Sequence, residues 1–232
     1  MNIVFPILKL KTCIPLTLFF FVSSCSTPRR NNEAKNAEPR PPVKCMENSP
    51  ERRGEEGCTI LANRPLIGSV TDDVYWHIDR FDSLEAAMKA AGPNGVAAQA
   101  HGSFWLMTVE TKTEDHHGGN HVASIGPLKL PALDRYSMRV QSSLIMPGAA
   151  TPAHTHPGPE AIYVVDGEQC LETPETGVHL AAGQFYVVPN GVIHRGRPIG
   201  SKARRAFGLN LYDAAHPTSH DLDNPPPLAS CK

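Results

Sequence analysis

The sequence predicts an all-β fold with one short helix, and three observations support this. From Tyr136 onward, short apolar runs are separated by turn residues such as Pro189-Asn190-Gly191, and no helical pattern lies between them. Residues 136–146 alternate between apolar and polar side chains, which is typical of a strand. Ser83 precedes a single helix-forming run that ends at Gly92-Pro93. Many short strands without helices between them indicate a sandwich or a barrel.

Alternation along 136–146 gives this strand two different faces. Met138 and Val140 share one face, and Arg139 and Gln141 share the other. Because a charged side chain rarely faces a core, we expect Arg139 and Gln141 to face solvent. The alternative is an inward face that holds an anionic ligand. Further strands are expected at 74–78, 104–111, 122–125, 161–165, 178–180, 185–188 and 206–212.

Composition separates a globular part from two atypical ends. The chain has 232 residues, 41% of them hydrophobic, so one large domain with a core is possible. A formal charge of −1 gives no electrostatic reason to expect a nucleic-acid partner. Residues 25–65 are charged and rich in proline, which predicts a disordered linker or tether. We expect the barrel domain over 66–216 and a Pro-rich tail over 217–232.

Residues 1–24 are predicted to be a signal peptide for export. Two lysines precede an apolar run, Ile14 to Val22, that is shorter than the roughly 20 residues that span a bilayer. Val22-Ser23-Ser24-Cys25 resembles the bacterial lipobox, in which the cysteine is lipidated and becomes the mature N-terminus. The protein is then a lipoprotein with a membrane anchor at Cys25. In the alternative, cleavage near Ser24 releases a soluble periplasmic or secreted protein.

Four cysteines remain once Cys13 and Cys25 are set aside. They are Cys45, Cys58, Cys170 and Cys231, an even number in an oxidising compartment, and they allow three pairings. Disulfides Cys45–Cys58 and Cys170–Cys231 form the most economical pairing, because the first closes a loop in the linker and the second fixes the tail to the barrel. The sequence leaves the choice open.

Two short segments carry metal-binding side chains. His154 and His156 are two residues apart on an extended segment, so both imidazoles leave the same face. A bend at Pro157-Gly158-Pro159 lets Glu160 return toward them, and His194 follows the Pro189-Asn190-Gly191 turn. Three imidazoles and one carboxylate suit Fe, Mn, Co, Ni, Cu or Zn better than Ca or Mg. We therefore expect one divalent transition metal on these four side chains.

These segments resemble the two motifs of the cupin family. The first motif, 148–167, matches at Gly148, Gly167 and the three ligand positions, and the second, 183–194, matches at Gly183, Pro189, Gly191 and His194. Pro198 stands where family members often have an asparagine that is not a metal ligand. The resemblance implies a single-domain, double-stranded β-barrel (jelly roll) with the ion inside. It also implies a homodimer in which an N-terminal strand crosses to the partner.

An octahedral ion with four protein ligands keeps two adjacent positions open, which is typical of a working metal rather than a structural one. The first hypothesis is therefore a dioxygenase-like oxidoreductase that acts on a small enol, phenol or carboxylate. A redox-neutral lyase or isomerase is the second hypothesis. A non-catalytic module that binds a metal or a small ligand at the cell envelope is the third. No catalytic residue beyond the ligands can be assigned from the sequence.

Overall fold

The computed structural model describes residues 40–47, 56–68, 73–111, 117–130, 132–133 and 135–231. The predicted signal peptide 1–24, the lipidation residue Cys25 and the linker up to residue 39 lie outside the described residues. Within the described ranges, no helix is long and apolar enough to cross a membrane.

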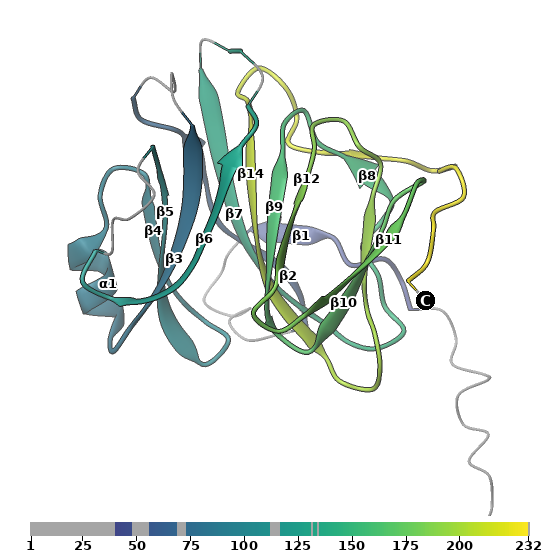
Figure 1. Cartoon of the computed structure of the whole chain (residues 1–232), viewed down its shortest axis with the longest axis horizontal. Helices are drawn as coiled ribbons and strands as arrows, with labels where there is room; N and C mark the ends of the chain where they lie inside the picture. The colour runs from purple at the N-terminus through teal and green to yellow at the C-terminus, as the bar shows by residue number, and fades with distance from the viewer. Residues whose placement is uncertain are drawn as a thin grey trace, which may run out of the picture. The chain divides into compact units, whose positions relative to one another are not determined.

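The predicted all-β barrel with one short helix is confirmed. Its larger wall is a six-stranded sheet in the order β1-β2-β7-β14-β9-β12. The bounds of these strands are β1 Cys45–Glu47, β2 Gly57–Pro65, β7 Tyr136–Ile145, β14 Arg204–Asp213, β9 Glu160–Asp166 and β12 Phe185–Val188. The other wall is a three-stranded sheet of β11 (Gly177–Ala181), β10 (Glu168–Glu172) and β13 (Arg195–Pro198). A short pair, β15 (His220–Asp221) with β8 (His154–Thr155), completes the barrel (Figure 1).

A second sheet of four strands lies beside the barrel, on the left of the view in Figure 1. Its order is β4 (Gly95–Ala100), β5 (Ser103–Glu110), β3 (Val74–Phe81) and β6 (Asn120–Leu128). The helix α1 (Leu84–Ala90) follows β3, and the Ser83 side chain caps it by accepting a hydrogen bond from the Ala86 N–H. The N-cap predicted from the sequence is therefore present.

The main hydrophobic core lies between the four-stranded sheet and the outer face of the barrel. Trp76 and Trp105 from the four-stranded sheet belong to the same buried cluster as Met138 and Val140 of β7 and Leu209 of β14. The four-stranded sheet thus covers the apolar face of β7 from outside the barrel. Burial of these apolar side chains is the main contribution to the stability of the fold.

This packing contradicts our expectation that Arg139 and Gln141 face solvent. Both side chains line the cavity inside the barrel. The expectation failed because it assumed that the barrel interior takes the apolar face of β7. The four-stranded sheet takes that face instead, and the polar face is left to the interior.

The linker prediction is wrong for the segment that precedes the domain. Residues 57–65 form β2, which pairs antiparallel with β7 from Gly57 opposite Leu144 to Pro65 opposite Ser137. Cys58 and Ile60 on this strand are buried. The short strand β1 pairs parallel with β2 and is joined to it by a disulfide between Cys45 and Cys58. Order in the barrel sheet therefore begins well before residue 66.

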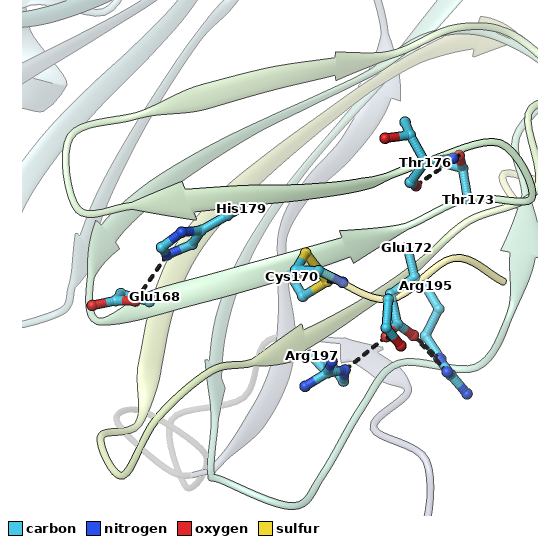
Figure 2. The surroundings of a disulfide bond; sticks show 10 residues. Glu168, Cys170, Glu172, Thr173, Thr176, His179, Arg195 and Arg197 are labelled. Carbon is cyan, nitrogen blue, oxygen red and sulfur yellow. Dashed lines mark hydrogen bonds and ion pairs between the residues drawn. A yellow bond between two sulfur atoms is a disulfide. The ribbon is translucent and has the colours of Figure 1, made fainter.

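The C-terminal tail also packs against the barrel. A disulfide joins Cys231 to Cys170 of β10, and Ser230 donates a hydrogen bond to the buried carboxylate of Glu172 (Figure 2). Arg195 and Arg197 donate to the same carboxylate. Burial would raise the pKa of Glu172, but hydrogen bonds from Arg197, Arg195 and Ser230 outweigh it and lower that pKa. The tail is thus held by a covalent bond and by a charged cluster.

Candidate metal centre

Backbone pairing brings the two histidine segments together. His154 and His194 exchange two backbone hydrogen bonds of 3.0 Å each, which joins the start of β8 to the segment before β13. The Gly191 N–H donates to the His156 carbonyl at 3.0 Å. The turn at Pro189-Asn190-Gly191 is therefore hydrogen-bonded directly to the first motif.

The bend between His156 and Glu160 depends on glycine. A Cβ atom at Gly158 would overlap the carbonyl oxygen of Leu211 on β14. Because the backbone of the bend lies this close to β14, Glu160 begins β9 at the point where its side chain can reach the histidines. Any larger residue at 158 would push the bend away from the sheet.

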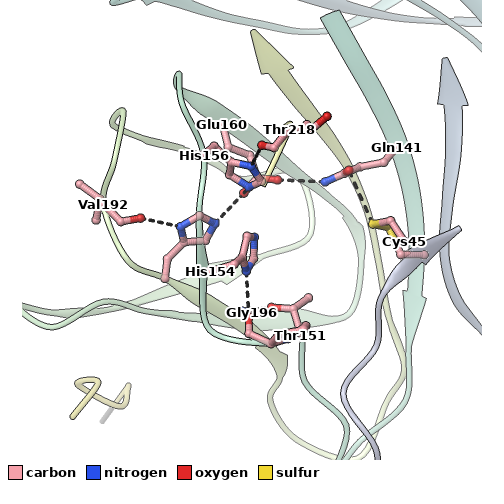
Figure 3. Close-up of polar contacts among 12 residues, drawn as sticks. Cys45, Gln141, Thr151, His154, His156, Glu160, Val192, Gly196 and Thr218 are labelled. Atoms are coloured by element: carbon pink, nitrogen blue, oxygen red, sulfur yellow. Dashed lines mark hydrogen bonds and ion pairs between the residues drawn. A yellow bond between two sulfur atoms is a disulfide. The ribbon is translucent and has the colours of Figure 1, made fainter. Parts of the chain in front are cut away.

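The four predicted ligands converge in the barrel interior. One nitrogen from each of His154, His156 and His194 and one carboxylate oxygen of Glu160 all lie within 4.8 Å of one another. Figure 3 shows His154, His156 and Glu160 close together. His156, His194 and Glu160 are buried, and His154 is partly exposed to the cavity. Residues that are 40 positions apart in the chain thus share one small volume.

Backbone carbonyls fix the orientation of all three imidazoles. The Nδ1 atoms of His154, His156 and His194 lie 2.8, 2.6 and 2.9 Å from the carbonyl oxygens of Pro152, Thr218 and Val192. Since a carbonyl only accepts, each Nδ1 carries the proton and donates. Each Nε2 of a neutral ring then presents a lone pair to the centre of the group, which is the usual arrangement of histidines that bind a metal.

The remaining contacts fit a cation. The Nε2 atom of His194 lies 2.8 Å from a Glu160 oxygen, and in the neutral ring these are two acceptors that face each other. The His156 Nε2 is buried with no hydrogen-bond partner and lies 3.6 Å from the same oxygen. Adjacent ligands on an ion with bonds of about 2.1 Å are separated by about 3 Å. A divalent transition metal therefore fits this donor set and would satisfy atoms that otherwise repel one another or lack a partner.

Two of the four side chains have the protonation state that binds metals at neutral pH, whereas for His156 the lowering of the pKa by burial is outweighed by Glu160, which raises that pKa. Burial, followed by the neighbouring His194, lowers the pKa of His154 to about 4. Burial would raise the pKa of Glu160, but the imidazoles of His156 and His194 lower it well below its usual range. His154 is therefore neutral and Glu160 is ionised near pH 7, which are the forms that bind metals.

Gln141 of β7 holds the carboxylate in place. Its Nε2 donates to the Glu160 oxygen Oε1 at 2.9 Å, which leaves the other oxygen directed at the histidines (Figure 3). Gly208 on the neighbouring β14 makes this possible, because a Cβ there would lie 2.7 Å from the Gln141 amide nitrogen. The sequence pointed to the polar face of β7 but could not assign Gln141 this role.

The centre opens onto a cavity of about 210 Å³. Its charged side chains are Glu160, Arg139 and Arg204, together with an ion pair of Lys44 and Asp221 at 2.6 Å. Arg204 is buried, which the sequence alone did not indicate. Since the ion pair cancels, the cavity carries one excess positive charge before any metal is counted.

The sequence-predicted site residues are thus located as follows. The structure brings together His154, His156, Glu160 and His194. It pairs the cysteines as Cys45–Cys58 and Cys170–Cys231. Arg204 was missed because it lies outside both motifs, and the sequence does not distinguish it from the neighbouring Arg205, which is not buried.

Comparison with known proteins finds a similarity over part of the chain. Residues 142–207 match the family model of the Cupin domain, a span that contains all four ligand residues. No curated protein sequence matches the chain. This part of the barrel is therefore similar to the cupin domain, and the match covers less than half of the chain.

Several solved structures are similar to part of the chain. A cupin-like protein from Thermotoga maritima is 19% identical over 38% of this chain and 64% of that chain, with a TM-score of 0.33. A polyketide cyclase from Streptomyces resistomycificus is 20% identical over 40% and 64%, with a TM-score of 0.32. A salicylate 1,2-dioxygenase variant from Pseudoaminobacter salicylatoxidans is 18% identical over 32% and 20%, with a TM-score of 0.29. The chain spans less than two thirds of the length of each.

Proposed function

We propose that this cupin-domain protein is a metal-dependent oxygenase of the cell envelope that acts on a small enol, phenol or carboxylate. The observation that carries the proposal is the set of four converging ligand atoms at the wall of a cavity. A metal enclosed on all sides would be structural, whereas one beside a cavity keeps positions for a substrate. Bound there, a divalent transition metal supplies a Lewis acid and open positions for a substrate oxygen and for dioxygen.

The residues of the chain have distinct parts in this function. The three imidazoles and Glu160 hold the ion, and the single negative charge of Glu160 leaves the ion partly uncompensated. Gln141 keeps the carboxylate oriented through its 2.9 Å hydrogen bond. The excess positive charge of the cavity attracts an anionic substrate oxygen.

A redox-neutral lyase or isomerase is less well supported, because it needs a general base. Among the described residues that line the cavity, the imidazoles and carboxylates are the four ligands and Asp221. Asp221 forms an ion pair with Lys44 at 2.6 Å. No described side chain is thus placed to remove a substrate proton. A non-catalytic binding module is the third alternative.

Metal content and oxygen uptake test the proposal. The full chain is required, because β1 and β2 belong to the barrel sheet and a protein that starts at residue 66 would lack them. Bound metal is measured first, and phenolic and diketone substrates are then screened in an oxygen electrode. We expect oxygen uptake that is lost in His154→Ala and retained in His179→Ala, whose imidazole is exposed and contacts Glu168.

Other outcomes select among the alternatives. Turnover without oxygen uptake would support the lyase or isomerase, and metal-dependent ligand binding without a product would support the binding module. A wild-type protein that binds no transition metal would contradict all three.

We also propose that the protein is exported and anchored by a lipid on Cys25. Support comes from the signal-like residues 1–24 and from the two disulfides, which persist in oxidising compartments. Cys25→Ser should move the protein from the membrane fraction to the soluble periplasmic fraction. Unchanged partitioning would instead indicate plain secretion.

The homodimer implied by the family resemblance stays a prediction. Sedimentation velocity of the purified protein should give twice the mass of the monomer, which is 25.2 kDa before the proposed signal peptide is removed. A monomeric mass at micromolar concentration would contradict it.

A further inference from the structure

Arg204 is a buried cation without an anionic partner. The residue is 4% exposed and lies at the start of β14 with its side chain in the wall of the cavity. Within the described part of the chain, no carboxylate lies at ion-pair distance from it. Its one hydrogen bond goes from Nη1 to the Ser143 hydroxyl, and its buried Nε has no partner. A buried charge of this kind is costly unless something compensates it.

Gln169, which lies beside Arg204, also has a buried polar atom without a hydrogen-bond partner in the described part of the chain. Its side chain lines the cavity, the residue is 1% exposed, and its Oε1 has no hydrogen-bond partner among the described residues. A Cβ at Gly196 would lie 3.5 Å from the Gln169 amide and 3.6 Å from the Arg204 Nη2. Arg204 and Gln169 therefore meet around Gly196, which leaves the space over them free of a side chain.

This group lies close to the metal centre. Gly196 follows His194 by two residues on one extended segment, which corresponds to roughly 7 Å along the chain. A small molecule can therefore reach the metal with one end and Arg204 with the other. Burial, opposed only by the distant charge of Glu160, lowers the pKa of Arg204 to about 10, so the side chain stays charged at neutral pH.

We infer that Arg204, Gln169 and Ser143 form a carboxylate-binding subsite in the cavity, and that the substrate is a small carboxylic acid with a second oxygen that binds the metal. This inference rests on the proposed function and narrows its substrate class. The guanidinium presents a fork of N–H donors that matches a carboxylate in two parallel hydrogen bonds. The Gln169 Oε1 can accept a hydrogen bond from a hydroxyl group of the same molecule. Arg139, on the same cavity wall, adds to the attraction.

Calorimetric titration of the full chain with succinate, acetate and inorganic phosphate tests the subsite, in metal-free and metal-loaded protein. We expect Arg204→Gln to weaken succinate binding at least about 30-fold, since a buried charged partner is lost. The matched control is Arg205→Gln. Arg205 is the next residue on β14, points to the opposite face and pairs with Asp166 at 2.7 Å, so its loss should change affinity less than about 2-fold. Metal loading should favour succinate over acetate.

Arg204→Lys serves as a second variant, because it keeps the charge and removes the fork; it should still weaken succinate binding several-fold. We expect all three variants to bind the metal as tightly as the wild type does, and this result would show that each variant is folded. The inference is overturned if folded Arg204 variants bind succinate as the wild type does, or if phosphate binds more tightly than succinate. If the chain binds no metal but succinate binding still depends on Arg204, the proposed function fails and the subsite stands. If oxygen uptake is observed but does not depend on Arg204, the proposed function stands and the subsite is refuted.

Discussion

In the candidate metal centre the ligand side chains point toward one another, and backbone carbonyls hold the imidazoles in this orientation. Each of the three imidazoles is held by a carbonyl oxygen two residues earlier in the chain or, for His156, by Thr218 in the C-terminal tail. Only Glu160 is oriented by another side chain, that of Gln141. Gln141 is therefore the residue outside the ligand set on which metal affinity should depend most.

Gln141→Leu keeps the approximate volume and removes the hydrogen bond to Glu160. We expect metal affinity to fall about 10- to 100-fold, as is usual when the support of a ligand is lost. Competition with a chromogenic chelator measures it. Gln99→Leu is the control, because Gln99 is exposed on β4 of the other sheet. Equal affinity of the two variants would show that Gln141 does not position Glu160.

A second residue-scale prediction concerns His101, which lies outside the metal centre. It lies in the turn between β4 and β5 with a φ of 50°, and its Nε2 is 3.0 Å from the Ser142 hydroxyl. Burial lowers the pKa of His101 from 6.5 to about 4. Because the folded pKa is lower, the unfolded chain binds more protons between these values. The resulting stability is complete above pH 6.5 and is lost as the pH falls toward 4.

His101→Asn removes this titration, and asparagine tolerates the positive φ. Between pH 7 and pH 4, the wild type should lose up to about 3 kcal/mol more of its free energy of unfolding than the variant. Urea unfolding of both proteins across this range measures the difference. All other titrating groups are the same in the two proteins, so their contributions cancel in the difference between the two free energies of unfolding. If the free energy of unfolding changed with pH in the same way in both proteins, His101 would not be held neutral by the fold.

At the scale of elements, two terminal segments pack against the barrel beside the cavity. The cavity wall includes residues 43–45 of one segment and Ser219 and Asp221 of the other, and Lys44 joins the two segments through its ion pair with Asp221. Each segment also has its own disulfide, one to β2 and one to β10. The C-terminal segment supports the candidate metal centre directly, because the Thr218 carbonyl accepts a hydrogen bond from the Nδ1 of His156.

Removing the C-terminal disulfide should therefore affect both stability and metal binding. The cysteines are 61 residues apart, and the chain-entropy model gives a loss of about 4 kcal/mol for Cys170→Ser with Cys231→Ser. For the 13-residue separation of Cys45 and Cys58 it gives about 3 kcal/mol. Urea unfolding should therefore show a larger loss of stability for the variant without the Cys170–Cys231 disulfide than for the variant without the Cys45–Cys58 disulfide. Metal affinity should fall in the Cys170/Cys231 variant, and unchanged affinity would mean that the tail stays in place without its disulfide.

At the scale of the whole molecule, the barrel and the four-stranded sheet share one core. Trp105 packs edge-on against Phe207 of β14, with ring centroids 5.2 Å apart, and Trp76 is fully buried in the same cluster. Neither sheet could bury these side chains alone. We therefore expect the two to unfold together.

Two probes can test this cooperativity. Both tryptophans of the chain lie in the four-stranded sheet, so their fluorescence reports that sheet, whereas bound metal reports the barrel. Fluorescence change and metal release should share one urea midpoint. Trp105→Ala should move both midpoints to lower urea by the same amount, through a loss of about 3–5 kcal/mol. Separate midpoints would show that the two sheets are independent folding units.

Local patterns in the sequence determined a large part of this picture. The strand at 185–188 and the helix after Ser83 follow from residue periodicity and capping, which depend only on near neighbours. The four ligands were predictable because two motifs carry them at spacings that extended chain and tight turns convert directly into geometry. The donor set likewise limited the metal to the transition series.

The tertiary structure decided what depends on partners far away in the chain. Strand β2 is stabilised by pairing with β7, some 80 residues later, so its charged surroundings were a poor guide to its structure. Which face of β7 turns inward was settled by the four-stranded sheet that covers the other one. Arg204 became a candidate for substrate binding only once the fold had buried it without a counter-charge. Long-range contacts of this kind leave no periodic signal, because the residues that make them are neighbours only in space.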